Sequence, residues 1–161
     1  MADAIFLKIP DVPGDSTVAN FADQIEVLSF NHGVSAQVTS DVSNQNRTSG
    51  RPMHQDFTLT KFLDKSSPLL NQKCCMGSVL GEVVVTVGRN DAGEILELVT
   101  YTLSDVVISS VSVGGGGGGK PVETVSLNYS AITWTYVVQA EGGGGDGNVV
   151  GAWDLSENTA P

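Results

Sequence analysis

The chain is poor in positive charge and has no long apolar stretch. Its 161 residues hold 8 lysines and arginines against 18 acidic side chains, for a net charge of −10. Such a balance opposes binding to phosphate backbones and to anionic membrane surfaces. No apolar run approaches the roughly 20 residues that a membrane-spanning helix needs. Nucleic acid and membrane insertion are therefore not expected.

Cysteine is scarce, and its two copies are adjacent, at Cys74 and Cys75. A disulfide between neighbours would be strained, and no usual metal-ligand spacing joins them to His32 and His54. Cys74 also falls near the C-terminal end of a predicted helix, where the partial negative charge disfavours a reactive thiolate. We expect two reduced packing residues and no metal site.

A secretory leader is not expected at the N-terminus. Residues 1–10 lack a basic first segment, and Ile5, Leu7 and Ile9 alternate with Phe6 and Lys8. This pattern is typical of a strand of the mature protein rather than of a signal peptide. The chain is expected to fold in the cytoplasm.

One short helix is predicted, at about residues 67–76. Ser67 is the predicted N-cap, Pro68 suits the first helical position, and Gly77 can adopt the left-handed conformation that ends a helix. Leu69, Leu70 and Cys74 would share an apolar stripe.

The other periodic runs alternate as strands do. In residues 23–31, Leu28 and Phe30 are expected on the core face, with Ser29 and Asn31 on the opposite, wet face. Arg89 to Glu94 is predicted to turn a hairpin, with Gly93 placed for a positive φ. The remaining predicted strands cover residues 4–9, 34–39, 53–61, 82–87, 95–103, 106–113, 122–138 and 149–154. About eight strands at hairpin spacing predict a β-sandwich or a closed barrel, with the helix alongside.

The longest run, residues 122–138, changes its apolar parity partway. Apolar side chains occupy odd positions up to Ala131 and even positions from Ile132 onward. The change indicates a bulge, a strand that passes between sheets, or two covered faces. Flexible loops are predicted at residues 40–52, 114–120 and 141–148, because these segments are polar or glycine-rich.

The sequence contains no motif that predicts an active site. Gly114 to Lys120 looks like a phosphate-binding loop, but Pro121 follows where a hydroxyl is required, and a strand rather than a helix comes next. His54 and Asp56 could share a strand face, but no serine has a nucleophile setting, so a surface pair is the better interpretation. His32 is interpreted as a turn residue. Neither a catalytic residue nor a cofactor is predicted.

Several short segments, in order, resemble the haemolysin-coregulated protein (Hcp) family of type VI secretion tube proteins. They are Ile5-Phe6-Leu7-Lys8-Ile9, Asp11-Val12-x-Gly14-Asp15-Ser16, Ile25-Glu26-Val27-Leu28-Ser29-Phe30, Phe57-x-x-x-Lys61, Asp64-Lys65-Ser66-Ser67-Pro68-x-Leu70, Val106 to Ser112, Trp134-Thr135-Tyr136 and Gly151 to Asn158. The likeness covers nearly the whole chain. The loop that is glycine-rich in many relatives is here the polar segment 41–52.

The resemblance implies one Hcp-like domain over residues 1–161. Its fold would be a two-sheet β-barrel with a helix alongside, similar to phage tail tube proteins. Such chains form hexameric rings that stack into a tube, which a contractile sheath expels with a spike protein at its tip and effectors inside. The implied protein is not an enzyme. It would leave the bacterial cytoplasm for the exterior or a target cell without a cleaved signal peptide.

Three groups of residues are candidates for assembly. Ser29 and Asn31 are predicted to face the lumen, if Leu28 and Phe30 face the core. The candidates for core or subunit interface are Ile132, Trp134 and Tyr136. The candidates for ring-to-ring contact are Asn44, Gln45, Asn46 and Arg47.

Two other classes of function stay open at this point. The first is a monomeric β-sandwich module that binds carbohydrate or protein, with Trp134 or Trp153 as a stacking platform. The second is a hydrolase that uses His54 and Asp56.

Overall fold

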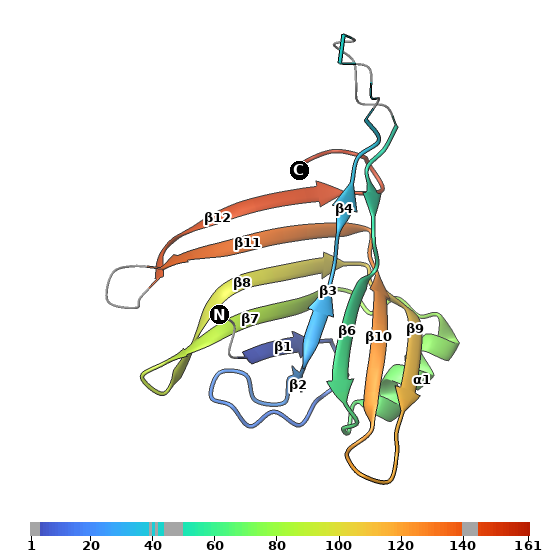
Figure 1. The fold of residues 1–161 in the computed structure, drawn as a ribbon, viewed down its shortest axis with the longest axis vertical. Coiled ribbons are helices and arrows are strands. Elements are labelled where there is room, and N and C mark those ends of the chain that lie inside the picture. The colour runs from blue at the N-terminus through green and yellow to red at the C-terminus, as the bar shows by residue number, and fades with distance from the viewer. Residues whose placement is uncertain (1–3, 39, 41, 44–49, 140–144) are drawn as a thin grey trace.

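The computed structural model describes residues 4–38, 40, 42–43, 50–139 and 145–161, and contains twelve strands and one helix in that part of the chain. A six-stranded sheet in the order β12-β11-β8-β7-β1-β2 packs across a four-stranded sheet in the order β3-β6-β10-β9, with α1 beside β9 (Figure 1). The elements are β1 (Ala4–Lys8), β2 (Ile25–Glu26), β3 (Ser29–Asn31), β4 (Val34–Ser35), β5 (Met53–His54), β6 (Phe57–Phe62), α1 (Ser67–Met76), β7 (Val83–Asp91), β8 (Glu94–Ser104), β9 (Val107–Gly114), β10 (Val122–Asn128), β11 (Ala131–Gln139) and β12 (Gly145–Asp154).

The predicted two-sheet β-barrel with one helix is confirmed, although the two hydrogen-bonded sheets do not join into one closed ladder. The predicted hairpin is β7–β8. Its two turn residues, Ala92 and Gly93, have φ of 51° and 90°, which is the conformation that suits the right-handed twist of the flanking strands. Within the described residues, no helix is long and apolar enough to cross a membrane.

The chain passes between the two sheets four times, and two of these crossings fall inside runs that we predicted as single strands. Residues 23–31 do not form the single strand we predicted, because β2 belongs to one sheet and β3 to the other. The amide of Val27 bonds the carbonyl of Ile5 at 3.0 Å, and the next amide, that of Leu28, bonds Thr60 in the other sheet at 2.7 Å. The parity change in residues 122–138 marks the other of these two crossings, from β10 to β11. Of the three interpretations, passage between sheets is correct.

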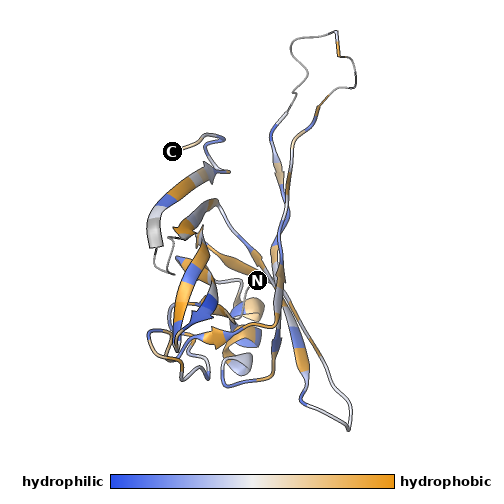
Figure 2. Cartoon of the chain, turned by 60° about the vertical axis from the view of Figure 1, so that its left-hand side comes forward, coloured by the Kyte–Doolittle hydropathy of each residue, from blue (hydrophilic) through white to orange (hydrophobic). Residues whose placement is uncertain are grey.

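One apolar core lies between the sheets, and the strands alternate inward and outward as predicted. Phe57 and Leu59 on β6 and Val125 and Leu127 on β10 are fully buried. Figure 2 shows the resulting alternation of apolar and polar residues along the strands. The strand pattern alone thus identifies the inner face of the four-stranded sheet.

The helix spans the predicted residues, but its N-terminus differs. Ser66, not Ser67, is the N-cap, and its side chain makes no capping bond. The Ser67 hydroxyl instead accepts the Asp64 amide at 3.1 Å. Gly77 ends the helix with φ of 61°, as predicted, and Leu70 is buried in the core.

A long arm rises from the end of the four-stranded sheet (Figures 1 and 2). We define the arm as β4, β5 and the described residues between them. The predicted strand at 34–39 is only the two residues of β4, which pair with β5. The segment after Gly114, by contrast, joins β9 to β10 as a plain hairpin, so no helix follows that glycine run.

Candidate functional site

The outer face of the four-stranded sheet carries only neutral polar side chains in its two central rows. Because paired residues share a face, the register gives the rows: Ser29, Thr60, Thr124 and Ser112, then Asn31, Thr58, Ser126 and Ser110. We call these eight residues the hydroxyl face. In Figure 2 the sheet is nearly edge-on, and the other described elements lie on one side of it. The hydroxyl face is therefore left free.

The candidate lumen residues, Ser29 and Asn31, are exposed on this face. Phe30 points the other way, with its ring stacked on Phe57 at 5.6 Å between centroids. The expectation that Leu28 also faces the core is wrong, because its side chain is 49% exposed. Leu28 lies at the crossing between the sheets, where the strand alternation breaks.

Both edges of the four-stranded sheet are open. Among the described strands, β3 pairs only with β6 on one side, and β9 pairs only with β10 on the other. An open edge presents unpaired backbone amides and carbonyls to a further strand. Each edge thus offers backbone groups to which a further strand can pair.

The three residues predicted for core or interface differ in burial along β11. Ile132 is 1% exposed, Trp134 is half-buried, and Tyr136 is 50% exposed. Tyr136 pairs with Val149 on β12, which is 63% exposed. We call Tyr136 and Val149 the overhang pair, because they lie on the core-facing side of the six-stranded sheet beyond the part that the core covers.

A buried ion pair, which sequence reasoning missed, joins the four-stranded sheet to α1. The Lys61 Nζ lies 3.1 Å from Glu123 Oε2 and 3.2 Å from Asp64 Oδ1, and it donates to Ser67 Oγ at 3.3 Å. Lys61 is 0% and Glu123 1% exposed. The available signal was strand parity: Lys61 follows Phe57 and Leu59 on the inward face.

His54 and Asp56 do not form the predicted surface pair. Asp56 accepts hydrogen bonds from Ser109 at 2.7 Å and Asn128 at 3.0 Å. His54 contacts the Tyr129 hydroxyl instead, at 3.3 Å. His32 lies between β3 and β4 and contacts the same hydroxyl. Nothing in this arrangement supports a hydrolase.

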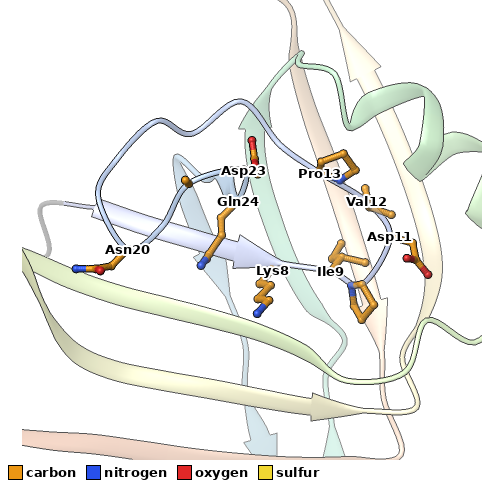
Figure 3. Close-up of a pocket in the computed structure, with 10 residues that line it drawn as sticks. Lys8, Ile9, Asp11, Val12, Pro13, Asn20, Asp23 and Gln24 are labelled. Atoms are coloured by element: carbon orange, nitrogen blue, oxygen red, sulfur yellow. The ribbon is translucent and has the colours of Figure 1, made fainter.

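A pocket of about 400 Å³ lies beside β1, but its polar groups do not converge. Asp11, Asn20 and Asp23 point in different directions (Figure 3). In the part of the chain that the structure describes, no three His, Cys, Asp or Glu side chains are placed to hold a metal ion. Of the two free cysteines, Cys74 packs against the core as predicted, whereas Cys75 is exposed.

The remaining candidates are two tryptophans and the polar loop. Trp134 and Trp153 are half-buried against the core, and His54 stacks on Trp134 with centroids 6.2 Å apart, so the Trp134 ring is partly covered. Asn44 to Arg47 lie outside the described residues. Nearby on the arm, Val34 and Met53 are 47% and 61% exposed.

Comparison with known proteins agrees with this architecture. Residues 6–136 match the family model described as "Type VI secretion system effector, Hcp". Protein hcp1 of Pseudomonas aeruginosa is 32% identical over 160 residues, covering 98% of each chain. A solved type six secretion system protein superposes with a TM-score of 0.91 at 27% identity, covering 98% of this chain and 99% of the other.

Hcp1 from Salmonella typhimurium superposes with a TM-score of 0.82 at 26% identity over the full length of both chains. The matches extend from end to end, and they cover both sheets and the helix. They come from a family of structural secretion proteins rather than of enzymes. The chain therefore belongs to the Hcp family, and it is a tube protein of the type VI secretion system.

Proposed function

We propose that the chain forms hexameric rings in which β9 of each copy pairs with β3 of its neighbour. The observation that carries this proposal is the four-stranded sheet, whose two edges are both open within the described residues. Strand addition at open edges joins chains through backbone hydrogen bonds. Because the two edges are different surfaces, the contact is heterologous, and a heterologous contact closes into a ring when its rotation allows.

Exposed apolar side chains support the same arrangement. The overhang pair lies toward the ends of β11 and β12 that extend away from α1 (Figure 1). On the side that carries α1, Met76 and Val79 are 63% and 62% exposed. In a ring, the overhang pair of one copy would cover the α1 side of the next copy. Burying these four side chains would add a hydrophobic contribution to the edge pairing.

The hydroxyl face would then line the lumen, with Ser29 and Asn31 among its residues. The eight residues of this face carry no charge, although the chain has a net charge of −10. A neutral wall neither holds nor repels a charged cargo strongly. Effectors inside the tube would be held by hydrogen bonds to hydroxyl and amide groups, and could leave after expulsion.

The arm is the proposed contact between rings, through the segment that includes Asn44, Gln45, Asn46 and Arg47. It extends beyond both sheets at one end of the molecule (Figure 1). The wider partners of the tube are a sheath and a spike protein, as for the Hcp family. The single domain of residues 1–161 would act without catalysis and travel from the bacterial cytoplasm to the exterior with the tube.

Native mass spectrometry tests the proposed ring. We expect a species of six times 16.8 kDa at micromolar concentration. We expect few oligomers of two to five copies. A closed ring pairs the sheet edges of every copy, whereas an open assembly leaves two sheet edges unpaired. A monomer that persists to millimolar concentration would count against ring assembly and favour a monomeric binding module.

A further inference from the structure

Three breaks between consecutive strands lie where the arm joins the four-stranded sheet, which we call the root of the arm. Residues 32–33 separate β3 from β4, residues 55–56 separate β5 from β6, and residues 129–130 separate β10 from β11. His32 lies in the first, His54 borders the second, and Tyr129 lies in the third. The arm therefore joins the sheet through a point where neither of its strands is continuous.

The Tyr129 hydroxyl contacts both histidine side chains. The Tyr129 oxygen lies 3.3 Å from Nδ1 of His32 and 3.3 Å from Nδ1 of His54, and it donates to the Gln55 carbonyl at 3.1 Å. A phenol has one proton to donate. With that proton on the Gln55 carbonyl, an imidazole that carries its hydrogen on Nδ1 can donate it to the Tyr129 oxygen. Neutral imidazoles satisfy this arrangement.

Aromatic rings surround both imidazoles. His32 stacks on Phe57 with centroids 5.5 Å apart, and His54 stacks on Trp134 with centroids 6.2 Å apart. The His32 and His54 rings are themselves 6.4 Å apart. The Nε2 atom of His32 is buried without a hydrogen-bonding partner among the described residues. A proton added there would become a buried donor with no acceptor.

Burial is the main cause that keeps the two imidazoles neutral. Burial lowers the pKa of His32, the Gln55 backbone opposes this shift, and the charge of a protonated His54 lowers the pKa further. Burial also lowers the pKa of His54. Tyr101 on β8 and Tyr129 both have a raised pKa because of burial, and the carboxylate of Asp56 adds to the shift of Tyr129. β11 and β12 contribute Trp134 and Trp153, which do not titrate.

The strand pairing of the described arm is short. Among the described strands, β4 and β5 pair only with each other, through two residue pairs. A pocket of about 350 Å³, lined by Val34 and Pro52 on the arm and by Trp134 and Trp153 opposite, separates the arm from β11 and β12. The amide of Gln55 bonds the carbonyl of Gly33 at 2.9 Å across the root. The cluster is therefore a side-chain attachment at the point where the arm meets the sheet.

We propose that His32, His54 and Tyr129 form a lock that holds the arm in place near neutral pH and releases it in mild acid. Protonation places one or two positive charges in an aromatic enclosure, where they repel each other and leave the new Nε2–H donor of His32 unsatisfied. Opening the root hydrates both imidazolium groups. The lock is a property of the single chain and does not depend on ring formation.

The sign of the pH dependence follows from the direction of the shifts. The histidine pKa is about 6.5 in the open root and lower in the closed one. The open state therefore binds more protons below pH 6.5, and the closed state loses stability as the pH falls from there through the lowered pKa values. Above pH 6.5 the contribution of the two histidines to the closed state is fully present.

Two measurements test the lock. His32 and His54 are the chain's two histidines, so NMR can follow both Cε1–H signals in a titration, and both should titrate below pH 6.5. Hydrogen exchange, corrected for the intrinsic rate, should show the Gln55 amide exchanging at least tenfold faster at pH 5 than at pH 7.5. The amides of Leu59 and Val125, in the core strands, should show no such change.

Variants distinguish opening of the proposed lock from a loss of stability of the whole chain in acid. His32→Gln with His54→Gln should remove the pH dependence of Gln55 exchange, and Tyr129→Phe should speed this exchange at both pH values. Should the double variant not fold, His54→Gln alone should reduce the pH response. Histidines that titrate at or above pH 6.5, or equal Gln55 exchange at the two pH values in the unaltered protein, would overturn the proposal.

Discussion

Replacing Lys61 with alanine is expected to lower the free energy of unfolding by about 3 to 5 kcal/mol, because it leaves the Glu123 carboxylate buried and unpaired. Glu123 is 1% exposed, and its Oε1 already lacks a hydrogen-bonding partner in the described part of the chain. The substitution also removes the link from β6 to Ser67 at the start of α1. Chemical denaturation of the isolated chain, followed by circular dichroism, measures the loss.

Two further variants make this test specific. Lys65→Ala removes an exposed lysine whose Nζ lies 3.7 Å from Asp23, and it should cost less than about 1 kcal/mol. Lys61→Met combined with Glu123→Leu removes both buried charges and should recover most of the loss. If Lys61→Ala destabilises the chain no more than Lys65→Ala does, the ion pair does not support the fold.

The second large effect is expected at the overhang pair. Tyr136→Glu combined with Val149→Glu should raise the concentration at which rings form by at least about a hundredfold, since it places two carboxylates in a contact that excludes water. The two residues face each other across β11 and β12 and are already largely exposed in the single chain. The fold should therefore stay within about 0.5 kcal/mol of its original stability.

Val150→Glu is the matched control. Val150 lies on the same strand, is 61% exposed, and points to the opposite face of the sheet from Val149. Size-exclusion chromatography should show rings for Val150→Glu and monomers for the overhang variant at the same concentration. Rings that survive in the overhang variant would remove this pair from the interface.

Strand alternation predicted the parts of the fold where one face is buried and the strand is continuous. Phe57 and Leu59 point inward as their parity requires, and Gly93 lies in the predicted hairpin turn. The prediction for Leu28 was wrong because the chain changes sheet at that residue, and alternation cannot be carried across such a crossing. Local pattern thus predicts faces within a strand but not the crossings between sheets.

The candidate site was less accessible to sequence reasoning, because it depends on contacts between distant segments. Lys61 and Glu123 are 62 positions apart, and they meet only because β6 and β10 are paired. His32 and Tyr129 are 97 positions apart, and each was read in its local context alone. The two lumen candidates, by contrast, were found from parity, and the register of β6, β9 and β10 extended them to the hydroxyl face.

A cryo-electron microscopy map of the assembled protein tests the central proposal most directly. We expect a six-fold ring whose central hole is walled by β3, β6, β10 and β9. In this ring β9 of each copy is hydrogen-bonded to β3 of its neighbour, and the hydroxyl face is turned toward the hole. A ring whose hole is lined by the six-stranded sheet, or a sample that contains only monomers, would contradict it.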